Sequence, residues 1–150
     1  MGTLIEDARE AATWIATALS ASGYAADFSS GSLREIDRFF DEHAQDGAAK
    51  PGGLLAEDLG SRLFAIGAYV GEVVRRGLGG EWVADDRDPE AEINLALQLP
   101  DGSIVWPVQR AMKRLKNGTE DGIAAYGAVL GLDVSSVPPP APRRPWWKFW

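Results

Sequence analysis

The chain of 150 residues contains no cysteine and a single histidine, His43. Without cysteine, disulfide bonds, thiolate metal sites and cysteine nucleophiles are excluded. A single histidine cannot form a multi-histidine metal site, and it leaves one candidate base for a Ser-His-Asp triad. The sequence also lacks a Gly-x-Ser-x-Gly motif, a phosphate loop and a glycine-rich dinucleotide turn. We therefore expect no catalytic residues, no metal and no cofactor, and favour a non-enzymatic protein over an enzyme.

Long hydrophobic runs are missing as well. No apolar stretch approaches the roughly 20 residues that span a bilayer. The segment Met1–Asp7 is acidic, whereas a signal peptide places positive charge before an apolar stretch. A cytoplasmic location is therefore the expectation. A hydrophobic content of 45% and a charged content of 25% are ordinary for a globular protein, and the length suits one domain with an appendage.

Charge is unevenly distributed along the chain. Residues 134–150 hold three cations, Arg143, Arg144 and Lys148, and no acid. Removing these three positive charges from the net charge of −7 leaves −10 for the rest of the protein. An acidic body repels nucleic-acid phosphates, so we expect no nucleic-acid binding outside the tail.

Three helices are predicted in the first half of the chain. Apolar residues recur at helical spacing over Leu4–Leu19, from Ser32 to about Glu42, and over about Leu55–Arg76. Ser32 and Glu35 match a capping box at the start of the second helix. The third helix contains Gly67 and Gly71, which share a face. Because an interior glycine costs about 0.5–1 kcal/mol relative to alanine, this pair predicts close approach by a neighbouring backbone or side chain.

The second half predicts a small antiparallel sheet followed by two helices. Alternating strands are expected at Glu81–Ala84, Glu92–Leu99 and Ile104–Trp106, with a turn at Pro100–Ser103. Helices are expected at Val108–Lys116 and about Glu120–Leu130, the last one capped by Thr119 or Asp121, while Asp46–Gly53 reads as a loop. The sequence therefore predicts an α+β domain over residues 1–133, with three N-terminal helices, a β-meander and two C-terminal helices. Residues 134–150 are expected to form a flexible, disordered Pro-rich tail.

A ligand cleft is conceivable where the glycine-containing helix meets the strands, and its candidate residues are Tyr69, Glu72, Trp82 and Trp106. In that interpretation Glu72 is a carboxylate that faces the cleft beside Trp82. The simpler interpretation makes Glu72 an i,i+4 partner of Arg76, and Tyr69 a core residue with its hydroxyl at the rim. A deep polar pocket with a second titratable group facing Glu72 would favour the cleft.

Acidic residues are concentrated between Asp85 and Glu92. Hard cations prefer carboxylate oxygens, but the segment lacks the central glycine and the terminal glutamate of an EF-hand loop. A solvated acidic loop is the favoured interpretation. The loop is also a plausible contact for the cations of the tail.

The most informative segment is Pro138–Trp150, which reads Pro-Pro-Pro-Ala-Pro-Arg-Arg-Pro-Trp-Trp-Lys-Phe-Trp. Its prolines favour an extended chain that cannot bury the rings locally. Docking onto a protein groove, resting at an anionic membrane surface and folding over the protein's own body all remain open. We favour the protein partner. The binding residues in either external mode are Arg143, Arg144, Trp146, Trp147, Lys148, Phe149 and Trp150.

Three short motifs in the body carry a resemblance to known proteins. Residues 67–72 read Gly-Ala-Tyr-Val-Gly-Glu, residues 79–82 read Gly-Gly-Glu-Trp, and residues 113–118 read Lys-Arg-Leu-Lys-Asn-Gly. This pattern resembles a family of small bacterial domains of uncharacterised function, over roughly residues 33–132. The resemblance implies an α+β fold and a bacterial source, and it brings no catalytic residues.

Together these observations predict a non-enzymatic bacterial interaction module, in which an acidic domain presents an aromatic-basic docking peptide to a protein partner. Peripheral membrane attachment through the tail is one alternative. A small enzyme or ligand-binding domain that uses the cleft near Glu72, Trp82 and Trp106 is the other.

Overall fold

The computed structural model describes residues 3–135 and confirms the α+β class. Within this range the helices are α1 (Leu4–Ala21), α2 (Leu33–His43), α3 (Leu59–Leu78), α4 (Pro107–Asn117) and α5 (Ile123–Leu130). The 3-10 turns are η1 (Ser30–Ser32) and η2 (Gly118–Asp121), and the strands are β1 (Ala44–Gln45), β2 (Ala48–Ala49), β3 (Glu81–Val83), β4 (Ala96–Gln98) and β5 (Ile104–Val105). None of these helices combines the length and apolar character needed to cross a bilayer.

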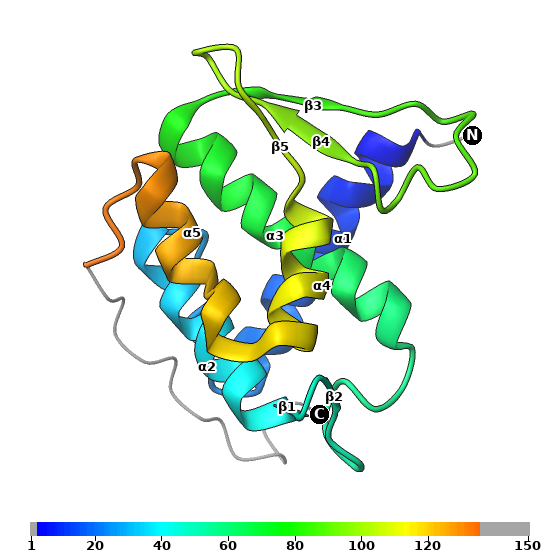
Figure 1. Ribbon diagram of the computed structural model, residues 1–150, viewed down its shortest axis with the longest axis vertical. Coiled ribbons are helices and arrows are strands. Elements are labelled where there is room, and N and C mark those ends of the chain that lie inside the picture. The colour runs from blue at the N-terminus through cyan, green and yellow to red at the C-terminus, as the bar shows by residue number, and fades with distance from the viewer. Residues whose placement is uncertain (1–2, 136–150) are drawn as a thin grey trace.

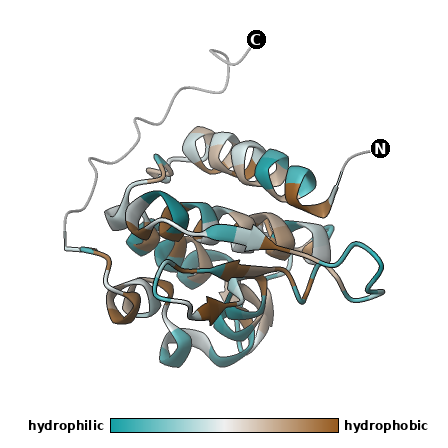
Figure 2. Cartoon of the chain, turned by 90° about the horizontal axis from the view of Figure 1, so that it is seen from above, coloured by the Kyte–Doolittle hydropathy of each residue, from teal (hydrophilic) through white to brown (hydrophobic). Residues whose placement is uncertain are grey.

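Helix α3 crosses the middle of the domain and is the element around which the others pack. In Figure 1, α1 lies behind it and α4 in front, and both helices contact it extensively. The pair α2 and α5 forms one side, and the sheet of β3, β4 and β5 covers one end. Seen from above in Figure 2, α1 runs along one side of the domain, and the three-stranded sheet lies in front of the other helices. The predicted order of three helices, a three-stranded meander and two helices is correct, although strands β1 and β2 lie between α2 and α3 in addition.

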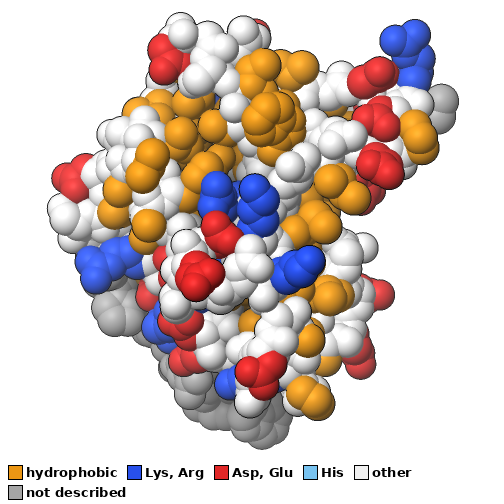
Figure 3. Space-filling model, viewed as in Figure 1, with side chains coloured by type: hydrophobic (Ala, Val, Ile, Leu, Met, Phe, Trp, Pro, Cys, Tyr) orange, Lys and Arg blue, Asp and Glu red, His pale blue; other side chains and the backbone are white. Residues whose placement is uncertain are grey.

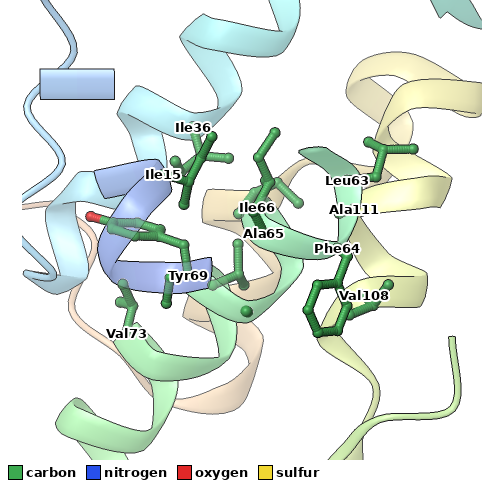
Figure 4. Packing of buried hydrophobic residues seen from close by; sticks show 14 of the residues in the cluster. Ile15, Ile36, Leu63, Phe64, Ala65, Ile66, Tyr69, Val73, Val108 and Ala111 are labelled. Carbon is green, nitrogen blue, oxygen red and sulfur yellow. The ribbon is translucent and has the colours of Figure 1, made fainter. Parts of the chain in front are cut away.

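The core follows from the apolar face of α3. An unbroken buried segment runs from Leu63 to Val74, because helices or the sheet surround this helix on most sides. Figure 4 shows Ile15 of α1 and Ile36 of α2 on one side of α3, and Val108 and Ala111 of α4 on the other.

The two glycines of α3 explain how its neighbours come so close. A Cβ on Gly67 would lie 2.5 Å from the Cα of Val108 in α4, and a Cβ on Gly71 would overlap the indole of Trp82 in β3. The prediction that both glycines face packed neighbours is therefore confirmed. One glycine admits a helix backbone, and the other admits an aromatic ring.

Strands β3, β4 and β5 form the predicted antiparallel meander, with Trp82 opposite Leu97 and Leu97 opposite Val105. Gly102 turns the chain between the last two strands with a φ of 89°. The expected strand Glu92–Leu99 is too long, because only residues 96–98 pair. The Asp88 carboxylate accepts hydrogen bonds from the backbone of Glu90 and the side chain of Asn94, and so holds residues 88–94 in turns.

Two local predictions are wrong. Residues 44–49 form a small hairpin, not only a loop, and it turns at Asp46 and Gly47, which have φ values of 54° and 80°. Asp-Gly is a strong two-residue hairpin signal, so the sequence contained this information. Ser32 is not a side-chain cap, since it is itself in a 3-10 turn and its hydroxyl bonds to Ser29 and Tyr69.

Candidate functional site

Glu72 lies near the C-terminal end of α3 and is buried, with 4% of its side chain exposed. Its Oε2 accepts two hydrogen bonds from the Arg75 guanidinium, at 3.0 and 2.9 Å. Its Oε1 accepts the indole N–H of Trp82 at 3.0 Å. The side chains of Arg9 and Arg76 come within 3.9 and 3.7 Å of the same carboxylate. Glu72 is thus more than a surface partner of Arg76, because it ties α1, α3 and β3 together.

Two opposing influences act on the ionisation of Glu72. Burial raises its pKa, whereas the hydrogen bonds from Arg75 and Trp82 and the charges of Arg75 and Arg76 lower it. The lowering influences prevail, so the pKa lies below the usual value of 4.5 and the side chain is an anion at neutral pH. A general acid or base works best with a pKa near the working pH. Glu72 is therefore poorly suited to proton transfer and well suited to fixing arginines.

An open pocket of about 320 Å³ lies beside this carboxylate, between α1 and α3. We call it the arginine pocket, and its lining residues are Arg9, Ala12, Thr13, Phe28, Glu72, Arg75 and Arg76. Phe28 comes from the connection between α1 and η1, and the Arg76 guanidinium stacks over its ring at 3.9 Å. Three guanidinium groups surround one carboxylate here, which gives the pocket a formal charge of +2.

Of the four residues of the predicted cleft, Glu72 alone lines the arginine pocket. Glu72 and Trp82 are in contact, as the cleft required. Tyr69 is fully buried, bonds through its hydroxyl to Ser32 and to the backbone N–H of Phe28, and packs on the Phe28 ring. Tyr69 thus contacts Phe28, which lines the arginine pocket, but does not line the pocket itself.

Trp106 lies apart from the arginine pocket. It precedes α4, has 45% of its surface exposed and does not line that pocket. Other exposed hydrophobic residues of this end of the domain include Val83 of β3 and Ile104 of β5. Figure 3 shows hydrophobic side chains gathered over the sheet at the top of the view. Trp106 is thus exposed and is not among the residues that line the arginine pocket beside Glu72.

Arg9, Arg75 and Phe28 were not among the candidate residues. The spacing of Glu72 and Arg75 is i,i+3, so this pair was visible in the sequence. Arg9 and Phe28 lie 63 and 44 positions from Glu72 along the chain, and no local pattern connects them to it. Only the packing of α1 against α3 brings them to the pocket.

The acidic segment Asp85–Glu92 forms turns that use several of its carboxylates internally. Asp85 bonds to Arg87, and Asp86 accepts the backbone N–H of Leu4 at 2.8 Å, at the start of α1. Between residues 3 and 135, no group of three or more acidic or histidine side chains is placed to hold a metal ion. The predicted binding residues of the tail, from Arg143 to Trp150, lie outside the described residues.

Comparison of the chain with protein-family models, with curated proteins and with solved structures gives no match. The resemblance to a family of small bacterial domains therefore stays a prediction.

Replacing Glu72 with glutamine is expected to reduce the free energy of unfolding by about 1–2 kcal/mol at pH 7, because charge-assisted hydrogen bonds are lost. The folded-state pKa of Glu72 is lowered, so its contribution is fully present above the usual value of 4.5 and declines as the pH falls through the folded pKa. Urea unfolding of both proteins between pH 7 and pH 3 should show the two stabilities converging in acid. Glu81→Gln, on the exposed edge of the sheet, is the matched control and should change little at any pH. A Glu72→Gln deficit that stays constant with pH would contradict the ionised role.

Proposed function

We propose that this protein is a non-enzymatic interaction module, which presents its aromatic-basic C-terminal segment to a protein partner. The residues that would make the contact are Arg143, Arg144, Trp146, Trp147, Lys148, Phe149 and Trp150. The rings supply apolar contact area, and the cations steer the encounter with an acidic surface.

The observation that carries this proposal is that the described residues form a core of their own, which extends to the end of the described range. Leu132 is 7% exposed, packs against Gly77 at the end of α3 and donates its backbone N–H to Gly127. Val134 adds a last contact with the core. The described part of the chain thus forms a core from Leu4 to Leu132, with Val134 packed against it. We infer that the four rings of residues 146–150 serve to contact another surface.

The site geometry supports binding over catalysis. Both oxygens of Glu72 are occupied by N–H donors, and its pKa is lowered. An acid–base mechanism needs two groups that face each other, such as a pair of carboxylates or a base and a nucleophile. Among the described residues that line this pocket, Glu72 is the one carboxylate. The enzyme alternative therefore gains no support from the arginine pocket.

Truncation after Val137 tests the proposal. The shortened protein should keep the melting temperature of the full chain to within about 2 °C, since no part of the described core is removed. It should lose capture of its partner in a pull-down, as should the triple variant Trp146→Ala, Trp147→Ala, Trp150→Ala. Changing Arg143, Arg144 and Lys148 to glutamine should instead weaken capture in a salt-dependent way.

The alternatives give different results in the same experiments. Binding of the full chain, and not of the truncated chain, to vesicles containing anionic lipid would indicate membrane attachment. A truncation that lowers the melting temperature by many degrees while leaving every interaction intact would show that the segment belongs to the fold.

A further inference from the structure

The arginine pocket holds more positive charge than its carboxylate requires. Glu72 is already paired, with two hydrogen bonds from Arg75 and one from Trp82. Arg9 and Arg76 approach it only at 3.9 and 3.7 Å, too far for a hydrogen bond. Three like charges are therefore gathered around one negative charge, in a body whose overall charge is negative. Among the residues that line the pocket, Glu72 offsets one of these three positive charges.

Arg9 and Arg76 also retain their hydrogen-bonding capacity. Within the described part of the chain, neither guanidinium donates a hydrogen bond in the structure. Each guanidinium carries five N–H donors in a planar fork, an arrangement that matches the oxygens of a phosphate or carboxylate. Their side chains are 59% and 50% exposed, so these donors are accessible from solvent.

Two of the three arginines are held in place before any ligand arrives, and the third lies on a helix of the core. Arg75 is fixed by Glu72, and Arg76 by the ring of Phe28, which in turn packs on buried Tyr69 with the ring centroids 4.7 Å apart. Arg9 comes from α1, whose register on α3 is set by the core. Groups that are already ordered lose less conformational entropy on binding, which favours affinity. The location of Arg75 and Arg76 near a helix C-terminus would explain two cations electrostatically, but it does not explain Arg9, which lies on another helix.

We propose that the arginine pocket binds the phosphate group of a small phosphate monoester, with Arg9, Arg75 and Arg76 around its oxygens. The formal charge of +2 matches a phosphate dianion better than a carboxylate. The volume of about 320 Å³ admits the phosphate group and a few further atoms, and the open side leaves the rest of the ligand in solvent. Glu72 is a positioning residue that holds Arg75. This site is independent of the C-terminal segment.

The test is titration of the full-length protein with glycerol 3-phosphate, inorganic phosphate and acetate, followed by calorimetry and by NMR chemical shifts. We expect saturable binding of the two phosphates with shifts confined to α1, Phe28 and the end of α3, and binding of acetate at least about tenfold weaker. Arg9→Gln and Arg76→Gln should each weaken phosphate binding by about tenfold or more, because a charge-assisted contact is lost. Both side chains are half exposed, so neither change should unfold the domain, whereas Arg75→Gln would remove two of the three hydrogen bonds that buried Glu72 accepts.

Arg34→Gln is the matched control, since it removes one positive charge from an exposed position on α2. It should leave the affinity unchanged within about twofold. If Arg34→Gln and Arg76→Gln weaken phosphate binding equally, the effect of Arg76 is due to general electrostatic attraction, and the proposed site is wrong. Absence of saturation by either phosphate up to about 20 mM, or shifts located elsewhere, would overturn it as well. Binding of inorganic phosphate with no binding of glycerol 3-phosphate would contradict the monoester as ligand. The truncation after Val137 should bind phosphate normally, so failure here and failure of the docking proposal are separable.

Discussion

Replacing Asp37 with alanine is expected to lower the free energy of unfolding by about 3–4 kcal/mol. The Asp37 carboxylate binds the Arg114 Nε at 2.9 Å and also accepts the backbone N–H groups of Ile123 and Ala124, at 2.8 and 2.9 Å. The substitution therefore removes a partner of a guanidinium that is only 3% exposed and uncaps α5. Removing one partner of a buried ion pair typically costs about 3–5 kcal/mol, and losing a helix cap about 1 kcal/mol. Arg114 keeps Asp41 and the Asp37 carbonyl as partners, so the expected total lies at or below the smallest sum of these two costs.

Asp41→Ala is the matched control for this experiment. Asp41 also contacts Arg114, at 2.7 Å, but its side chain is 57% exposed and caps no helix. Its removal should cost about 1 kcal/mol or less. Urea unfolding followed by circular dichroism measures both variants. If the two substitutions cost the same, the cap and the buried pair at Asp37 do not stabilise the domain as the geometry indicates.

Replacing Gly71 with alanine is expected to cost about 3 kcal/mol, although alanine is the better helix former. The new methyl group would overlap the Trp82 ring, which would have to move away from α3. That movement breaks the indole bond to Glu72 and disturbs the packing of β3. Overpacking of a core contact typically costs about 1–3 kcal/mol, and a lost hydrogen bond to a charged group adds about 1.5–3 kcal/mol, against a gain in helix propensity of about 1 kcal/mol.

Gly60→Ala is its control in the same helix. No atom lies within 4 Å of a Cβ at this position, so only helix propensity changes. We expect it to stabilise the domain by about 0.5 kcal/mol. A Gly71→Ala protein that is as stable as Gly60→Ala would show that Trp82 moves freely and that the contact is not a constraint.

Local pattern was sufficient for most of the fold. Apolar periodicity predicted all five helices within a few residues, and Pro100–Ser103 predicted the β4–β5 turn. The pair Gly67 and Gly71 predicted close packing, because each glycine weakens the helix and a close neighbour explains why both stand on one face. These features depend on neighbours within one or two turns of the chain, which are visible in the sequence.

Helix starts were predicted less well, and for the last helix a partner far away in the chain decided the start. The last helix begins at Ile123 and not at Glu120, with Asp37 as its cap in place of Thr119 or Asp121. The third helix begins at Leu59, four residues later than expected. Any side chain that the fold places beside a helix N-terminus can accept the capping hydrogen bond, so residues remote in the sequence can cap the helix in place of local ones.

By itself, the sequence determined the α+β class, the order of elements, the acidic character of the body and the aromatic-basic composition of residues 143–150. The tertiary structure decided which charges meet. Arg9 reaches Glu72 only because α1 packs along α3, and Phe28 lines the pocket beside it. Trp82 reaches Glu72 only because Gly71 leaves room for the ring. Charged and aromatic side chains have no periodic signature of their own, and their environment depends on the packing of elements far apart in the chain. For that reason the arginine pocket could not be read from the sequence, whereas the helices that build it could.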